Sequence, residues 1–304
     1  MGAVCSAKWS AGWASGSGRR RRGRLAGLLI AAVALVLAAS GATTSAAAAV
    51  TPTYYLALGD SLSVGYMPPV KATNVGYVDD LYAGLHAKDA SLRLVKLGCS
   101  DESTTTMIKG GICHYDGASS QLRAATAFLA AHWGHVKYLT LDIGANDIDT
   151  CAATGTINVG CALSGLQSIA VNSATIIATL RSAAGWSTKF VGMNYYDPFL
   201  AAWLTGSAGQ RTAQLSALLT AVLNTAQGAE YRLAGAKVAD VAGAFSTYNF
   251  TQQTTIPGVG PVPVNVATIC RFTYMCTVQN IHPNAAGYQL MAGAFAAQLG
   301  VKLS

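Results

Sequence analysis

Strand-like and helical segments alternate along the chain from residue 53 onward, and this order constrains the fold more than any other feature. Short apolar runs rich in β-branched and aromatic residues are typical of buried strands. They occupy residues 53–58, 92–97, 136–143, 189–195 and 237–241. Stretches with helical spacing, rich in Ala, Leu and Gln, lie at 76–90, 119–132, 163–184, 209–234 and 284–299. This alternation predicts an α/β fold with a parallel sheet covered on both faces, whose functional groups gather at the carboxyl ends of the strands.

The first 49 residues have the pattern of a secretory signal peptide. A basic cluster within residues 19–24 precedes an apolar run over 25–39, and small residues follow. The run of ~15 residues is short for a membrane span, which needs ~20. We therefore expect cleavage near Ala48 or Ala49, with a retained N-terminal anchor as the alternative. Residues 50–304 then form one secreted, extracellular domain with a sizeable core.

The basic charge of the whole chain belongs to this leader. Six of the 20 Lys and Arg residues lie in it and none of the 13 Asp and Glu residues does, which leaves 14 basic against 13 acidic residues, a net charge of +1. Nucleic-acid binding depends on clustered Lys and Arg. We therefore expect no nucleic acid as partner, and no stable membrane insertion of the mature chain. The oligomeric state is not indicated by the sequence.

Cysteine usage agrees with export. Six cysteines remain after the leader, and six permit 15 connectivities. Pairing of sequence neighbours closes short loops, so we expect three disulfides, Cys99–Cys113, Cys151–Cys161 and Cys270–Cys276. A metal site is the competing interpretation, but no C-x-x-C or His-Cys cluster with ligand spacing occurs. We expect no metal and no other cofactor.

Short polar motifs follow the first three predicted strands. The first strand leads into Gly59-Asp60-Ser61-Leu62, in which the glycine permits a tight turn that presents the serine hydroxyl. Gly98 follows the second strand, and Gly144-Ala145-Asn146-Asp147 ends the third. The Gly98 backbone N–H and the Asn146 amide are suited to bind a developing oxyanion. Taken singly, each motif is more often an ordinary turn or helix cap.

A histidine before the last predicted helix is suited to act as a base. His282 lies in Asn280-Ile281-His282-Pro283-Asn284, where the loop and the following helix hold it. A serine hydroxyl is a weak nucleophile that needs such a base in reach. The other histidines lie in or beside helical stretches without a comparable motif, and we interpret them as structural: His86, His114, His132 and His135.

Together these motifs resemble the four sequence blocks of the SGNH, or GDSL, hydrolase family: G-D-S, a glycine, G-x-N-D and D-x-x-H. Ser61, Gly98 and the Gly144–Asp147 stretch match three blocks, and His282 matches the histidine of the fourth. The cysteine pattern is similar to that of the actinobacterial secreted lipase and esterase branch. The resemblance implies a three-layer α/β/α sandwich around a central, mainly parallel five-stranded sheet, as in flavodoxin. It implies Ser61 as nucleophile, His282 as general base, and an oxyanion hole made by the Ser61 and Gly98 N–H groups and the Asn146 amide.

The fourth block departs from the family pattern. Gln279 stands three residues before the histidine, where the family has aspartate, and neither it nor the following Asn280 supplies a carboxylate. Some family members work as a dyad in which a main-chain carbonyl orients the histidine. The resemblance implies the same here, with the carbonyl coming from the loop between Cys276 and Asn280. The side-chain oxygen of Gln279 is the alternative orienter.

These residues predict a secreted serine esterase or lipase, with a small-molecule or lipid ester as substrate. Residues 66–69, 195–199 and Trp203 suit an apolar acyl pocket, although ordinary packing explains them equally well. A carbohydrate O-deacetylase or a thioesterase on the same fold is the alternative, and a noncatalytic exported binding domain is a more distant one. The α/β-hydrolase fold places its serine in G-x-S-x-G in the middle of the chain, whereas Ser61 opens the domain.

Overall fold

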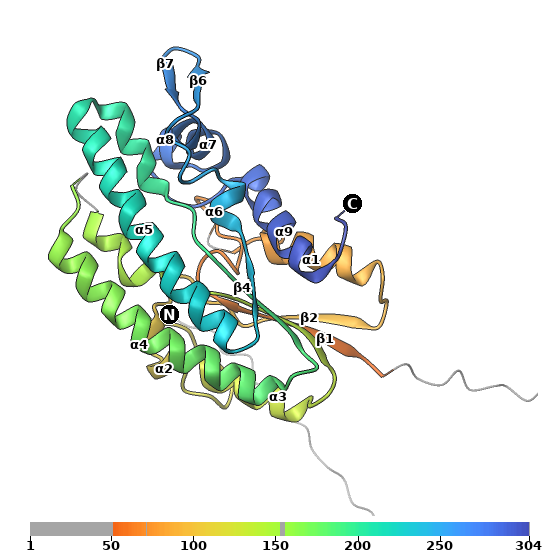
Figure 1. The fold of residues 1–304 in the computed structure, drawn as a ribbon. Helices are drawn as coiled ribbons and strands as arrows, with labels where there is room; N and C mark the ends of the chain where they lie inside the picture. Colours follow the sequence, from red (N-terminus) through yellow and green to blue (C-terminus); the bar gives the residue numbers. More distant parts are fainter. Residues whose placement is uncertain (1–50, 71, 153–155, 304) are drawn as a thin grey trace, which may run out of the picture. The chain divides into compact units, whose positions relative to one another are not determined.

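A sheet of five parallel strands, in the order β2-β1-β3-β4-β5, forms the centre of the fold within the described residues (Figure 1). Its strands are β1 (Thr53–Gly59), β2 (Leu92–Lys96), β3 (Val136–Asp142), β4 (Lys189–Met193) and β5 (Lys237–Ala239). The computed structural model describes residues 51–70, 72–152 and 156–303. The expected signal peptide over residues 1–49 lies outside them. Every predicted strand is present, and each ends within two residues of its predicted end.

Both faces of the sheet are covered, which explains why its central strands are mainly apolar. Tyr55 and Ala57 of β1 point into the core on one face, and Leu56 and Leu58 point into the core on the other. All four side chains have no exposed surface. Successive residues of a strand face opposite sides, so a strand that is buried on both sides must be apolar at every position.

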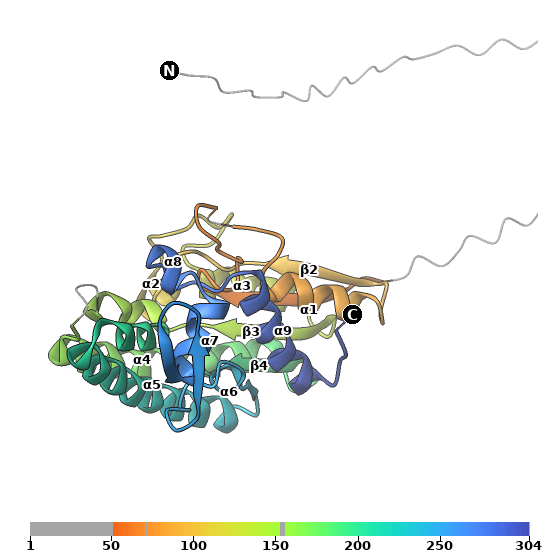
Figure 2. The same cartoon turned by 90° about the horizontal axis from the view of Figure 1, so that it is seen from above.

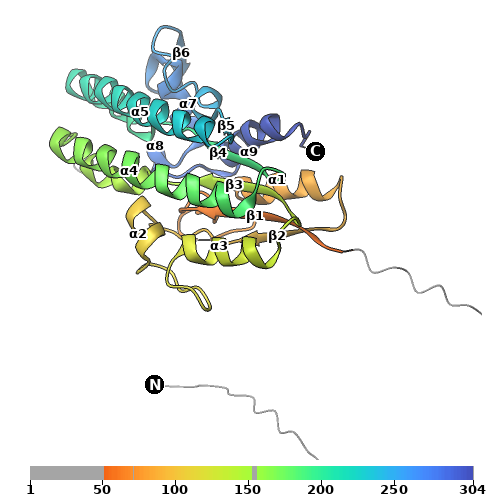
Figure 3. The same cartoon turned by 60° about the horizontal axis from the view of Figure 1, so that its bottom comes forward.

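Helices form the two outer layers. α1 and α9 lie side by side on one face, while α3 and α4 lie together on the other, with α2 next to them and α5 beside α4 (Figure 2, Figure 3). Their bounds are α1 (Tyr77–His86), α2 (Thr104–Lys109), α3 (Gln121–Ala131), α4 (Val159–Ala184), α5 (Ser207–Leu233) and α9 (Ala285–Leu299). This arrangement is the three-layer α/β/α sandwich predicted from the sequence.

Among the described helices, α4 is the one long and apolar enough to cross a membrane by length and composition alone. Its side chains Ile176, Ile177 and Leu180 are buried in the core, and the helix packs against α3 and α5. The apolar residues on this side of α4 are therefore part of the layer that covers the sheet.

The segment between β5 and α9 contains elements that the sequence analysis did not foresee. They are α6 (Val241–Ala244), a hairpin of β6 (Gln253–Ile256) and β7 (Gly260–Pro263), α7 (Val264–Phe272) and α8 (Met275–Val278). Three short 3-10 helices were also not predicted: η1 (Ala145–Asp147), η2 (Asp149–Ala152) and η3 (Pro198–Thr205). The hairpin projects beside α7 and α8 (Figure 1), and α7 and α8 directly precede the loop that carries His282.

The chain changes direction across the sheet between β1 and β3. β2 pairs with one edge of β1, and β3 pairs with the other. At such a switch point the loops after the two central strands diverge and leave a crevice at their carboxyl ends. The loop after β1 carries Ser61 and the loop after β3 carries Asn146, so the topology explains why two motifs far apart in sequence share one region.

The structure contains the three disulfides expected from the sequence, Cys99–Cys113, Cys151–Cys161 and Cys270–Cys276. Each fastens a segment near the carboxyl edge of the sheet. The first holds the loop that follows β2, the second joins η2 to the first turn of α4, and the third ties α7 to α8.

Removal of a disulfide should lower the free energy of unfolding. We expect Cys99→Ala/Cys113→Ala to cost about 3 kcal/mol and Cys270→Ala/Cys276→Ala about 2 kcal/mol, because the longer loop loses more entropy in the unfolded chain when it is closed. Urea titrations of the two double variants measure this. A reductant should lower the stability of the unmutated chain further than either double substitution, and no change in midpoint in any of the three would contradict the assignment.

Candidate active site

Ser61 lies at the carboxyl end of β1, in a turn that only glycine permits at its start. Gly59 has φ +139°, and a Cβ atom there would stand 2.2 Å from the backbone oxygen of Asp142. The chain therefore passes against β3 and turns sharply, with Ser61 just beyond. Ser61 is buried, with 8% of its surface exposed, and it lines a cavity.

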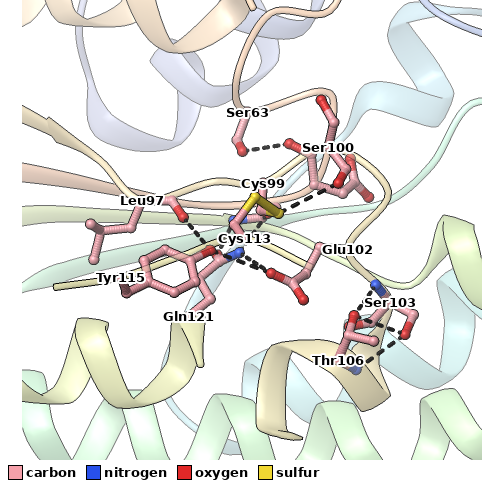
Figure 4. The surroundings of a disulfide bond; sticks show 12 residues. Ser63, Leu97, Cys99, Ser100, Glu102, Ser103, Thr106, Cys113, Tyr115 and Gln121 are labelled. Atoms are coloured by element: carbon pink, nitrogen blue, oxygen red, sulfur yellow. Dashed lines mark hydrogen bonds between the residues drawn. A yellow bond between two sulfur atoms is a disulfide. The ribbon is translucent and has the colours of Figure 1, made fainter. Parts of the chain in front are cut away.

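A glutamine side chain fixes this turn. The Gly59 N–H donates to Gln121 Oε1 at 2.7 Å, and Gln121 Nε2 donates back to the Gly59 carbonyl at 2.9 Å and to Glu102 at 3.1 Å. The Cys99–Cys113 disulfide and Tyr115 lie next to Gln121 and Glu102 (Figure 4). Both polar groups of Gly59 are thus satisfied by one side chain, which holds the residue before the serine turn in place.

His282 and Ser61 are in contact. His282 Nε2 lies 2.8 Å from Ser61 Oγ, although the residues are 221 positions apart. The loop that carries the histidine is held on both sides: Tyr274 N–H donates to the His282 carbonyl at 3.0 Å, and Tyr196 Oη donates to the Ile281 carbonyl at 2.7 Å. Asn284 then caps α9 by accepting from Gly287 N–H at 3.0 Å. The rigid entry to α9 expected from the sequence is therefore present.

The residue that orients His282 differs from both expectations. Asn280 Oδ1 accepts from the His282 backbone N–H at 3.1 Å, which closes an Asx-turn, and the same oxygen lies 2.8 Å from His282 Nδ1. The acceptor at Nδ1 is therefore the side chain of Asn280, not a main-chain carbonyl and not Gln279. Gln279 adopts the left-handed conformation with φ +54° and is exposed, so the turn directs Asn280 rather than Gln279 toward the ring.

This contact determines which nitrogen of the ring carries the proton. A backbone N–H can only donate, so the atom of Asn280 facing the His282 N–H is its oxygen. The same oxygen faces Nδ1, which must then carry the hydrogen. Nε2 is left with its lone pair directed at Ser61 Oγ. Neutral His282 is thus in the tautomer that accepts the serine proton.

Tyr66 covers the histidine ring. The two ring centroids are 4.0 Å apart, and the Tyr66 carbonyl accepts from Tyr288 Oη at 2.8 Å. Burial lowers the pKa of His282 to about 4, because its surroundings disfavour the charged imidazolium. No carboxylate accepts from Nδ1 to offset this effect. The imidazole therefore stays neutral, and able to accept a proton, down to mildly acidic pH.

The predicted oxyanion donors lie at the expected strand ends. Asn146 lines the cavity with Ser61 and His282. Its Nδ2 donates to the Glu102 carbonyl at 2.9 Å, which leaves its second hydrogen for a ligand. Within the described part of the chain, the backbone N–H groups of Ser61 and Gly98 have no hydrogen-bond acceptor.

Gly98 does not line the cavity. Gly98 lies against the turn after Ser61 instead. The approach is so close that a Cβ atom at Gly98 would stand 1.8 Å from Ser63 Oγ. Its role as an oxyanion donor therefore stays a prediction.

Two buried carboxyl groups lie beneath the serine turn. The Asp60 N–H donates to Asp142 Oδ2 at 3.0 Å, and Tyr77 Oη donates to the other oxygen of Asp142. Asp60 Oδ1 accepts from Leu62 N–H at 3.0 Å. Burial raises the pKa of both carboxyls, and the charge of Asp60 raises the pKa of Asp142 further. This pair was not foreseen from the sequence, in which Asp60 appears only as the middle of the G-D-S motif.

The cavity beside Ser61 extends between η1, η2, α4, η3 and α5. Apolar side chains line much of it: Ile148, Ile157, Leu166, Phe199, Leu219 and Leu223. Polar side chains also reach it: Asp60, Asn146, Asp149, Asp197, Ser216 and Thr220. Of the aromatic segments proposed for an acyl pocket, residues 195–199 line the cavity, whereas 66–69 and Trp203 do not. The remaining histidines, His86, His114, His132 and His135, lie outside it, as expected.

The described residues contain no group of three or more His, Cys, Asp or Glu side chains arranged for a metal ion.

A parallel sheet in the order 2-1-3-4-5, with a serine and a histidine in contact at its switch point, defines a hydrolase-type α/β/α fold. The chain belongs to the GDSL-like lipase/acylhydrolase family, whose model matches residues 57–290. The family resemblance seen in the sequence is thereby confirmed.

Solved structures share the fold at low sequence identity. A protein described as a GDSL-like lipase from Parabacteroides merdae is 14% identical, with a TM-score of 0.54 over 83% of this chain and 97% of that one. The extracellular lipase of Streptomyces rimosus is 17% identical, with a TM-score of 0.47 over 82% and 98%. LAE5, an α/β hydrolase from the Lake Arreo metagenome, is 19% identical, with a TM-score of 0.46 over 82% and 96%. The first similarity confirms the predicted fold. Comparison with curated protein sequences returned no match.

The titration of His282 tests the assigned environment without reference to activity. NMR of the imidazole nitrogens should give a midpoint near pH 4, with Nδ1 protonated above it, because burial disfavours the charged ring. Asn280→Asp should move the midpoint upward by more than one unit, since a carboxylate at Nδ1 stabilises imidazolium. Gln279→Ala is the matched control and should leave it unchanged. A shift in the control but not in Asn280→Asp would restore Gln279 as the orienter.

Proposed function

We propose that the chain is a secreted carboxylic ester hydrolase, an esterase or lipase, that works through a Ser61–His282 dyad. The observation that carries this proposal is the 2.8 Å contact between Ser61 Oγ and the unprotonated Nε2 of His282, beside unpaired N–H donors and an open cavity. A nucleophile, a base in reach and preorganised donors are the three requirements of acyl transfer. Membership of the GDSL-like family supports the same chemistry.

The proposed reaction has two halves. His282 Nε2 takes the proton of Ser61 as Oγ attacks the ester carbonyl, and the imidazolium then donates that proton to the leaving alcohol. Water attacks the resulting acyl-enzyme, again with His282 as base, and releases the carboxylic acid. The N–H groups of Ser61 and Gly98 and the second hydrogen of Asn146 Nδ2 bind the oxyanion in both halves. No metal or organic cofactor takes part.

Asn280 gives His282 orientation without charge. Its Oδ1 holds the Nδ1–H tautomer, as the carboxylate of a triad does, but a neutral amide stabilises the imidazolium less. The low pKa of His282, about 4, follows from burial without a compensating carboxylate. His282 is therefore a weaker base than the histidine of a triad, but it remains neutral at acidic pH.

Export is proposed from the leader and the cysteines together. Three disulfides persist in oxidising compartments, which supports residues 1–49 as a signal peptide cleaved near Ala48 or Ala49 and residues 50–304 as the mature catalytic domain. The same local disulfides support a place in the actinobacterial secreted branch of the family.

The substrate class is proposed from the lining of the cavity. The apolar side of the cavity suits the acyl chain of a small-molecule or lipid ester. The carboxyl groups that line the same cavity favour the alternative, a carbohydrate O-deacetylase, because sugars carry many hydroxyl donors. Hydrolysis of p-nitrophenyl esters from acetyl to palmitoyl, with acetylated xylan beside them, separates the two.

Covalent labelling tests the nucleophile directly. A fluorophosphonate probe should modify the protein stoichiometrically at Ser61, and Ser61→Ala should abolish both labelling and ester hydrolysis, because no other serine or threonine hydroxyl of the described residues lies against a histidine nitrogen. His282→Ala should slow labelling severely, while His132→Ala, outside the cavity, is the control. A folded protein that resists the probe would favour a noncatalytic binding domain.

Removal of one oxyanion donor should lower turnover more than substrate binding. Asn146→Ala should reduce kcat by on the order of 10²–10³ with little change in KM, because the amide acts on charge that develops only in the transition state. Asn172→Ala is the matched control, since its amide donates to Thr104 and Thr105 and does not line the cavity. Equal losses in both variants would point to a structural role for Asn146.

A further inference from the structure

One carboxylate oxygen in the cavity lacks a partner. Asp197 has 1% of its surface exposed; its Oδ1 accepts from Phe199 N–H at 2.9 Å and from Ser216 Oγ at 2.7 Å. Its Oδ2 is buried and has no hydrogen-bond donor among the described residues. Asp197 lines the same cavity as Ser61 and His282. A desolvated acceptor without a donor therefore belongs to a side chain in the wall of the space where a substrate of the proposed reaction would bind.

The unpaired oxygen is not needed for the fold. Asp197 caps η3 through Oδ1 alone, and Ser, Thr or Asn provides the same cap. A buried carboxylate oxygen without a donor is destabilising, so the cap does not explain why aspartate stands here. Asp80 and Glu102 also have one unpaired buried oxygen each in the described part of the chain, but neither residue lines the cavity.

The charge of the cavity favours a hydrogen-bond donor. Asp60 and Asp149 line it together with Asp197, and its lining residues include no Lys or Arg. Burial raises the pKa of Asp197 to about 7 and that of Asp149 to about 8, so above these values the lining is negative and repels carboxylates and phosphates. Oδ2 offers one open acceptor, whereas an ammonium needs three and a hydroxyl needs one. The apolar side chains Phe199, Leu219 and Leu223 are suited to cover the carbon atoms that carry such a hydroxyl.

We propose that this cavity is a subsite for a neutral, hydroxyl-bearing group of the ester substrate, and that the hydroxyl donates to Asp197 Oδ2. The inference rests on the proposed function, and it narrows the substrate class to hydroxylated esters. The hydroxyl belongs either to the acyl chain, as in a hydroxy acid, or to the alcohol, as in a polyol. Asp197 is a specificity residue in this assignment and has no part in proton transfer at Ser61.

Paired esters that differ by one donor test the proposal. The acyl pair is ethyl 3-hydroxybutyrate against ethyl 3-fluorobutyrate, and the alcohol pair is 2-hydroxyethyl butyrate against 2-fluoroethyl butyrate. Fluorine resembles a hydroxyl in size and electron withdrawal but cannot donate. Assays by pH-stat at pH 8.5 keep Asp197 ionised, since burial raises its pKa to about 7. In one of the two pairs, kcat/KM should favour the hydroxy ester by about 10- to 100-fold, as for one hydrogen bond to a charged group.

Asp197→Asn replaces the carboxylate oxygen that lacks a partner with a hydrogen-bond donor. The Phe199 N–H keeps the amide oxygen at the Oδ1 position, so an NH₂ group replaces Oδ2. The hydroxy preference, which is the ratio of kcat/KM for the hydroxy ester to kcat/KM for the fluoro ester, should fall to about threefold or less. Asp240→Asn is the matched control, because Asp240 also caps a helix through Oδ1 but lies outside the cavity, and it should keep the full preference.

The outcomes separate this inference from the proposed function. Ratios near one in both pairs, with all esters hydrolysed, overturn the hydroxyl subsite and leave the esterase intact. A higher kcat/KM for 2-(trimethylammonio)ethyl butyrate, a cationic ester without a free amine, than for 2-hydroxyethyl butyrate overturns the choice of a neutral donor. No hydrolysis of any ester, together with failure of the fluorophosphonate probe, overturns the proposed function itself. The ratios of the unmutated protein decide the matter even if Asp197→Asn fails to fold.

Discussion

The hydrogen bond between Ser61 Oγ and His282 Nε2 is the contact on which the rest of the site depends, because it joins the first strand to the entry of the last helix. Several elements between these two residues set the geometry of this hydrogen bond. The strand order 2-1-3-4-5 opens a crevice after β1, the Gly59 turn places the serine in it, and the Asn284 cap with the α7–α8 segment places the histidine opposite. A parallel sheet achieves this because all its strands end at one edge.

The site achieves orientation and charge stabilisation by separate means. In a triad one carboxylate does both. Here Asn280 fixes the tautomer of His282, whereas the carboxyl groups nearby lie elsewhere: Asp60 and Asp142 beneath the serine turn, and Asp149 and Asp197 in the cavity. The carboxyl groups of the region thus lie beneath the serine turn and along the cavity, and none of them lies against Nδ1 of the imidazole. This distribution is consistent with a histidine whose pKa burial alone governs.

The sequence predicts the sheet well because its central strands are largely buried on both faces and consist mainly of apolar residues. It also predicts which motifs come together, since three of them follow strands and strand ends share an edge. It does not predict Asn280 as the orienter, because that depends on an Asx-turn and on the left-handed conformation of Gln279, which no composition or period encodes. The sequence does not single out Asp197 either. It stands directly before Pro198 and resembles an ordinary helix cap, and only the structure shows that its second carboxylate oxygen is buried without a donor. The segment over residues 241–283 lacks any clear period, and its short elements form through tertiary contacts.

The bidentate contact of Gln121 with Gly59 has a consequence for how this chain tolerates change. The Cys99 N–H and the Gln121 amide approach the same side of Gly59, so the glutamine stands where a further residue of β2 would otherwise pair. A side chain here completes a ladder that the neighbouring strand leaves unfinished. The excursion between Cys99 and Gln121 therefore does not have to pair with β1, and the tolerance of the serine turn to change depends instead on Gln121 and on the contacts that hold it, which are Glu102 and the Cys99–Cys113 bridge.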